Sequence, residues 1–314
     1  MNNQLTTVAI TGAAGNLGTK LIRHLAAGDQ VKKAIGLDLH LPDNESKVLE
    51  GIDTDNFDLS YVQCDIGDWH DHRWQDTLNQ VDAVVHFAAQ NPYPEASWLD
   101  SGISMDINNN VIIAAADSSS IKRVVFATSN HVMGRYKDSP WSEMIGPGEL
   151  GSDTPPEVGT VWFTGKEHVN AAPYATAKFA GERLCKTLGA REQRKAAQNP
   201  AHERTTFVCV RIGWCQPGEN LPTTLSAAGT PTLDQGDTLG DPEDLARSDR
   251  WFKGMWLSNR DFTQLFEKAI LADGSAWPDS YILVNGMSQN TGMAWRLDET
   301  KALLGYEPVD DVYV

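Results

Sequence analysis

A tyrosine and a lysine four residues apart carry the strongest chemical signal in the sequence, in the segment Tyr174-Ala175-Thr176-Ala177-Lys178. On a helix this spacing places both side chains on one face. A tyrosine hydroxyl has a pKa of about 10 and is a poor base near neutrality. A neighbouring ammonium group favours the phenolate and should lower that pKa. We therefore expect Tyr174 to act as a general base and Lys178 to assist it.

A second polar group follows the strand-like run Arg123–Thr128, in the order Ser129-Asn130-His131. A serine hydroxyl at this point could hydrogen-bond the reacting oxygen, so Ser129 is the third expected catalytic residue. A histidine beside a strand end is often a packing or capping residue, and this alternative stays open for His131.

A glycine-rich turn lies between the first predicted strand and the first predicted helix, with the spacing G-x-x-G-x-x-G from Gly12 to Gly18. Glycines let the backbone approach a pyrophosphate closely, and the helix that follows offers free N–H groups and the positive end of its dipole. A strand before and a helix after are the context that a dinucleotide site requires. The expected cofactor contacts in this turn are Gly12, Ala14, Gly15, Asn16, Leu17 and Gly18.

Asp38 ends the second predicted strand, 20 residues beyond Gly18. A carboxylate at this position accepts hydrogen bonds from the adenosine ribose and repels a 2′-phosphate. Leu39 and His40 follow it, so no arginine is beside it to hold that phosphate. The sequence therefore predicts NAD rather than NADP as the cofactor. Further expected cofactor contacts lie at later strand ends, although each could be an ordinary strand terminus: Asp65, Ile66, Phe87, Ala88, Ala89 and Ile212.

Strand-like and helical patterns alternate along the first two thirds of the chain, which predicts an α/β fold with a doubly wound parallel sheet of the Rossmann type. The predicted strands are 6–11, 34–39, 61–64, 81–89, 123–128 and 206–212. The predicted helices here are 16–27, 106–118 and 174–188. The tail adds a helix over 262–272, a strand over 281–284 and a helix over 295–304.

Two segments, 135–172 and 216–250, lack either pattern and are rich in Pro and Gly. Long unpatterned segments in compact domains are usually functional loops, although flexible insertions are equally possible here. We expect an NAD-binding core over 1–212 with an insertion at about 135–172. The remainder, 213–314, should be a small, mainly substrate-binding part with an insertion at about 220–246.

The 314 residues include 26 Lys plus Arg against 42 Asp plus Glu, a formal net charge of −16. Such a chain repels nucleic acid and anionic membranes. No run of about 20 apolar residues could span a bilayer, and the N-terminus lacks the basic segment of a secretory signal. The four cysteines contain no C-x-x-C pair, so we expect free thiols, no metal site and a cytoplasmic protein.

The glycine turn, Asp38, Ser129 and the Tyr174/Lys178 pair together resemble the extended short-chain dehydrogenase/reductase family. More narrowly, three segments are similar to those of the uronate dehydrogenase group: 124–131, 210–217 and 256–262. The resemblance implies NAD-dependent oxidation of a sugar or sugar acid at C1 to an aldonolactone. It also implies that Lys178 holds the nicotinamide ribose and that Tyr174 contacts both the cofactor and the substrate.

The same resemblance implies substrate contacts from Asn91, Asn130 and His131, beside Ser129 and Tyr174. An arginine after 210–217 would meet a sugar carboxylate, and Arg247 and Arg250 lie in this region, with Arg250 taken as the expected contact. Trp214, where a smaller residue is usual, is the expected aromatic contact. A nucleotide-sugar epimerase or ketone reductase of the same superfamily, and a non-catalytic NAD sensor, remain alternatives. We expect a homo-oligomer, a dimer or larger.

Overall fold

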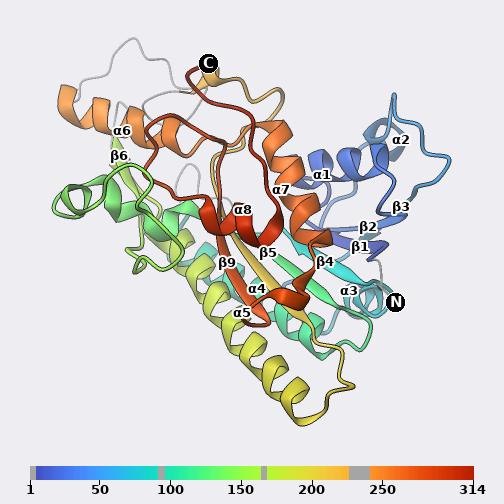
Figure 1. The fold of residues 1–314 in the computed structure, drawn as a ribbon. Helices are drawn as coiled ribbons and strands as arrows, with labels where there is room; N and C mark the ends of the chain where they lie inside the picture. The colour runs from blue at the N-terminus through green and yellow to red at the C-terminus, as the bar shows by residue number, and fades with distance from the viewer. Residues whose placement is uncertain (1–4, 91–95, 164–167, 226–240) are drawn as a thin grey trace.

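The computed structural model describes residues 5–90, 96–163, 168–225 and 241–314. Its centre is a seven-stranded parallel sheet in the order β3-β2-β1-β4-β5-β8-β9 (Figure 1). The strands are β1 (Thr7–Thr11), β2 (Lys33–Asp38), β3 (Asp58–Gln63), β4 (Ala83–His86), β5 (Arg123–Ser129), β8 (Thr206–Ile212) and β9 (Tyr281–Gly286). This is the expected Rossmann-type doubly wound fold.

Helices cover both faces of the sheet (Figure 1). The helices are α1 (Asn16–Ala27), α2 (Glu45–Val48), α3 (His72–Leu78), α4 (Trp98–Asp117), α5 (Ala172–Gln198), α6 (Pro242–Gly254), α7 (Asn259–Leu271) and α8 (Asp298–Leu304). Apolar residues of α1 and α7 pack against one face, and those of α3, α4 and α5 against the other. Side chains of β1 alternate between these two cores, as both-sided burial of a parallel strand requires. Among the described residues, no helix is long and apolar enough to cross a membrane.

Shorter elements fill the two segments that lack a pattern in the sequence. The first contains the 3-10 helices η1 (Asn130–Lys137) and η2 (Trp141–Met144) and an antiparallel hairpin of β6 (Val161–Phe163) and β7 (His168–Asn170). The second contains η3 (Pro222–Thr224) and the start of α6, while 226–240 lie outside the described residues. A further 3-10 turn, η5, spans Gly274–Ala276.

Several predicted bounds are wrong. Helix α4 begins at Trp98 rather than 106, because a capping box between Ser97 and Asp100 starts a turn whose side chains are largely exposed and show no apolar period. Helix α5 extends to Gln198, beyond the predicted 188, because its last turns are polar and show no apolar period. Strand β4 covers only Ala83–His86, and α8 begins three residues after the predicted 295.

The C-terminal strand adds to the central sheet. Strand β9 pairs in parallel with β8, with Ile212 opposite Gly286. Strand β5 pairs with β8 on its other side, with Ser129 opposite Ile212. The carboxyl ends of parallel strands meet at one edge of a sheet, which is where ligands bind in this fold. The glycine turn after β1, Ser129 and Ile212 all lie at this edge.

Candidate active site

The three expected catalytic residues meet at the carboxyl edge of the sheet. Ser129 is the last residue of β5, and Tyr174 and Lys178 lie one turn apart in the first turns of α5. The Ser129 hydroxyl oxygen accepts from the backbone N–H of His131 (3.1 Å) and lies close to the Tyr174 hydroxyl. The Lys178 ammonium donates to the carbonyl oxygen of Ala127 over 2.8 Å, which fixes α5 against β5.

Burial dominates the ionisation of this group. It raises the pKa of Tyr174 to about 12, and the polar side chain of Ser129 partly opposes this. Burial lowers the pKa of Lys178 to about 7. The expectation that Lys178 lowers the Tyr174 pKa is therefore wrong for this structure, because removal of the phenolate from water has the larger effect. The Lys178 nitrogen lies 5.7 Å from the centre of the Tyr174 ring.

The glycine turn has the shape that a pyrophosphate needs. Gly12 has a φ of +67°, a left-handed conformation that suits glycine. A Cβ on Gly18 would lie 2.4 Å from the Gly12 carbonyl oxygen. Gly15 caps α1 without any side-chain hydrogen bond to the first helical N–H groups. The residues present therefore fit a dinucleotide, whose pyrophosphate would be held by this turn and the N-terminus of α1.

Asp38 and the residues that follow β4 contact the glycine turn and the end of β1 that precedes it. The Asp38 carboxylate accepts from the backbone N–H groups of Ala14 (3.0 Å) and His40 (3.2 Å). The Thr11 hydroxyl accepts from the N–H groups of Phe87 (3.2 Å) and Ala88 (3.1 Å). The predicted cofactor residues of β2 and β4 thus lie against the glycine turn, and Ala89 follows them, partly exposed.

The remaining expected cofactor residues lie at neighbouring strand ends. Ile66 is buried, and its carbonyl oxygen accepts from Asn110 (2.8 Å). Asp65 is exposed and accepts from the Gly67 N–H (2.8 Å). The Ile212 carbonyl oxygen accepts from the Asn130 side-chain amide (3.0 Å).

A series of aromatic contacts begins at Tyr174 and includes His131 and Trp214, two of the residues expected to contact the substrate. The His131 ring lies 6.0 Å from the Tyr174 ring, edge to face, and 6.0 Å from the Trp162 ring, stacked. Phe252 of α6 then contacts both Trp162 and Trp214, at 5.8 and 5.3 Å. Burial lowers the pKa of His131 to about 4, so its ring is neutral at pH 7. His131 and Trp214 are thus connected through the aromatic rings of Trp162 and Phe252.

The two candidate arginines have different surroundings. Arg247 is held by ion pairs to Asp138 (3.1 Å) and Asp244 (2.5 Å). The buried Lys137 ammonium shares Asp138 (2.7 Å). Arg250 is exposed on α6. Asn91 lies outside the described residues.

Sequence reasoning missed one residue that positions the site. Asn108, buried in α4, donates to the Ala177 carbonyl oxygen (3.1 Å) and hydrogen-bonds the His86 ring (3.1 Å). It therefore joins β4 to the turn of α5 that carries Lys178. An asparagine at an apolar-facing position of the predicted helix 106–118 was the signal available.

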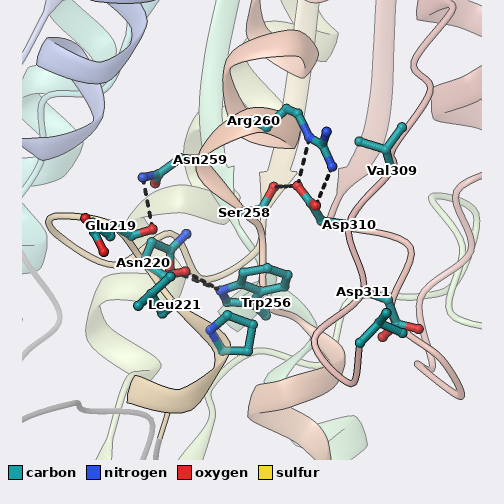
Figure 2. Close-up of a pocket in the computed structure, with 12 residues that line it drawn as sticks. Glu219, Asn220, Leu221, Trp256, Ser258, Asn259, Arg260, Val309, Asp310 and Asp311 are labelled. Carbon is teal, nitrogen blue, oxygen red and sulfur yellow. Dashed lines mark hydrogen bonds and ion pairs between the residues drawn. The ribbon is translucent and has the colours of Figure 1, made fainter.

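Figure 2 shows a cavity whose lining includes none of the expected substrate-binding residues. It has a volume of about 440 Å³ and lies between the loop at Glu219–Pro222, the start of α7 and the C-terminal segment. Arg260 and Asp310 form an ion pair on its wall. None of the expected catalytic or cofactor residues lines it.

The fold and the glycine turn define an NAD-binding protein, and comparison with known proteins agrees. The model of the NAD dependent epimerase/dehydratase family matches residues 8–198. The chain belongs to this family. It is an NAD-dependent oxidoreductase that acts on CH–OH groups.

Two curated relatives from Haloferax volcanii match almost end to end. L-arabinose 1-dehydrogenase (NAD(P)(+)) is 27% identical over 98% of each chain. NAD-dependent glucose-6-phosphate dehydrogenase is 28% identical over 97% of this chain and 93% of its own. Among solved structures, the UDP-glucuronic acid 4-epimerase of Bacillus cereus, in complex with UDP-glucuronic acid and NAD, is similar in fold. Its TM-score is 0.60 at 13% identity, over 98% of this chain and 95% of that one.

Proposed function

We propose that this protein oxidises a sugar or sugar acid at C1 with NAD, giving an aldonolactone. The observation that carries the proposal is that Ser129, at the end of β5, lies close to Tyr174, which is one helical turn from the buried Lys178. Support also comes from the two relatives that match nearly the whole chain, because both are named as sugar dehydrogenases.

In this mechanism Tyr174 removes the proton of the C1 hydroxyl group. Ser129 hydrogen-bonds the same oxygen and holds it against the phenol. When bound, NAD supplies the hydride acceptor for C1. General acid–base catalysis of this kind contributes roughly 10²- to 10⁴-fold to a rate. Proton removal from a sugar hydroxyl requires Tyr174 to ionise, so the pKa of about 12 in this structure has to fall when the site is occupied.

Lys178 and the glycine turn bind and orient the cofactor in this proposal. The Lys178 side chain would hold the nicotinamide ribose beside Tyr174. The turn from Gly12 to Gly18 and the N-terminus of α1 hold the pyrophosphate. Asp38 binds the adenosine ribose, which selects NAD.

For the substrate we assign Asn130, His131 and Trp214 to the walls of the pocket, with Asn91 as a further contact. Arg247 is already neutralised by two carboxylates. A sugar carboxylate would therefore have to be met by Arg250, which is exposed on α6. Because Arg247 is paired and Arg250 is exposed to solvent, neither arginine is a buried, unpaired partner for a carboxylate. We therefore expect an uncharged aldose to be a better substrate than a uronate.

The experiment is an NADH-formation assay with purified protein and NAD⁺ on a panel of aldoses, uronates and sugar phosphates. We expect turnover of at least one reducing sugar, with the lactone as the first product by NMR. UDP-sugar epimerisation without net NADH would instead favour the epimerase alternative, which one relative supports: the UDP-glucose 4-epimerase of Lacticaseibacillus casei is 28% identical over 57% of this chain. NAD binding with no turnover of any sugar would favour a sensor.

We also propose that the protein forms a homo-oligomer through α4 and α5. These helices pack side by side on one face of the sheet (Figure 1). The first turns of α4 expose Trp98 (66%) and Leu99 (76%), which water would solvate poorly. Light scattering should give a multiple of 34.4 kDa, and Leu99→Asp should reduce it.

A further inference from the structure

The β6–β7 hairpin is joined to η1 by a backbone hydrogen bond and leads directly into α5. On one side the Gly159 N–H donates to the His131 carbonyl oxygen (3.0 Å). On the other the Ala171 N–H donates to the Thr160 carbonyl oxygen (2.9 Å), just before α5 begins. The hairpin is therefore positioned by the same backbone that carries Ser129 and Tyr174.

Gly134 packs closely against Thr160, the residue that precedes β6. A Cβ on Gly134, in η1, would lie 2.1 Å from the Thr160 hydroxyl oxygen and 2.4 Å from its backbone nitrogen. The Thr160 hydroxyl hydrogen-bonds Nδ1 of His131 over 2.7 Å. Side chains two apart along a strand share a face, so Trp162 lies on the same side as Thr160. Its ring stacks on His131 with an interplanar angle of 13°.

Two buried polar atoms beside His131 have no hydrogen-bond partner among the described residues. One is the side-chain oxygen of Asn130, an acceptor whose amide nitrogen is already engaged by Ile212. The other is the indole N–H of Trp162, a donor, on a side chain that is 4% exposed. An unmet buried donor or acceptor is unfavourable until a ligand satisfies it.

A sugar hydroxyl both donates and accepts hydrogen bonds, so it complements this pair. The geometry points to Trp162 as a specificity-determining residue: we propose that its indole N–H donates to a hydroxyl oxygen of the sugar, while Asn130 accepts from a neighbouring hydroxyl. This inference rests on the proposed function. It gives the first inserted segment a role, which is to bring a hydrogen-bond donor into the substrate pocket.

The test compares Trp162→Phe with Trp295→Phe. Phenylalanine keeps an aromatic ring and removes the N–H. Trp295 is a matched control because its indole N–H is also buried without a partner, but its ring packs on Trp251 at 4.4 Å. We expect Trp162→Phe to raise the sugar KM roughly 5- to 30-fold with little change in kcat, since it removes one buried hydrogen bond. Trp295→Phe should leave KM unchanged, and both should bind NAD like the wild type.

Monodeoxy sugars provide a second measurement, on the substrate rather than the protein. In the wild type, removing the hydroxyl that Trp162 contacts should raise KM by about the same factor. In Trp162→Phe the same deoxy sugar should have the same KM as the parent sugar, because the variant has already lost the hydrogen bond. Trp162→His, which keeps a ring N–H, should recover part of the affinity and serves if the phenylalanine variant does not fold.

The outcomes separate the two proposals. A wild-type KM for Trp162→Phe in an enzyme that turns over sugar overturns the role of Trp162 and leaves the proposed function standing. Equal KM changes in Trp162→Phe and Trp295→Phe also overturn it, because a packing effect would then explain both. If the wild type turns over no sugar, both proposals fall.

Discussion

The ammonium nitrogen of Lys178 lies 2.8 Å from the carbonyl oxygen of Ala127, two residues before Ser129. This contact fixes the spacing between β5 and α5, and with it the meeting of Ser129 and Tyr174. It also places a cation in a buried position, where desolvation lowers the pKa of Lys178 from 10.5 to about 7. Burial of the charged Lys178 side chain therefore destabilises the folded protein.

Lys178→Met should therefore show opposite effects on activity and stability. The unfolded chain keeps the lysine proton to a higher pH than the folded chain. The buried Lys178 therefore lowers the free energy of unfolding by its full amount below about pH 7. This destabilisation becomes smaller as the pH rises from about 7 to 10.5. The change in Tm caused by Lys178→Met should be more positive at pH 6.5 than at pH 9.5, while kcat/KM falls by roughly 10²-fold or more. A change in Tm that is independent of pH would contradict the buried cation.

Gly18→Ala tests the glycine turn. The new Cβ would lie 2.4 Å from the Gly12 carbonyl oxygen, so the turn has to open. We expect a loss of about 1–3 kcal/mol in the free energy of unfolding and greatly weakened NAD binding by calorimetry. Gly102→Ala is the control: it lies within α4 with no atom within 4 Å of its Cβ position, and it should be stabilising by roughly 0.5–1 kcal/mol. Normal NAD binding by Gly18→Ala would rule out this turn as the pyrophosphate site.

Asp38→Asn tests cofactor choice. The side chain keeps its size but loses the charge that repels a 2′-phosphate, so NADP use should rise relative to NAD by roughly 5- to 50-fold in kcat/KM. The relative from Haloferax volcanii that is named as using NAD(P)(+) gives a reference for dual use. Asp29→Asn, at the far end of α1, changes the net charge equally and should leave the ratio unchanged. An unaltered ratio in Asp38→Asn would place the selectivity elsewhere.

The sequence was sufficient to predict the sheet and to name candidate residues that the structure places at one edge of it, because both depend on local patterns. The glycine turn, Asp38 and the Tyr174/Lys178 spacing are each set by a few neighbouring residues. The extra turns of α4 and α5 were not predictable from apolar period, since their exposed side chains follow none. The capping box at Ser97 and Asp100 was a readable signal for α4.

Contacts between segments that are distant in the sequence could not be predicted from local patterns. The pairing of Arg247 with Asp138 joins residues 109 apart, and no spacing rule predicts it. The stacking of Trp162 on His131 depends on the path of the inserted hairpin. The raised pKa of Tyr174 depends on burial, which a motif does not reveal.

The most direct test of the account is NADH formation by the wild type and by Tyr174→Phe, measured at saturating NAD⁺ with the best sugar of the panel. Tyr313→Phe, an exposed tyrosine near the C-terminus, is the matched control. We predict that the wild type and Tyr313→Phe produce NADH and lactone at equal rates. Tyr174→Phe should bind NAD normally but be slower by roughly 10²- to 10⁴-fold. Full activity in Tyr174→Phe would contradict the assignment of Tyr174 as the base.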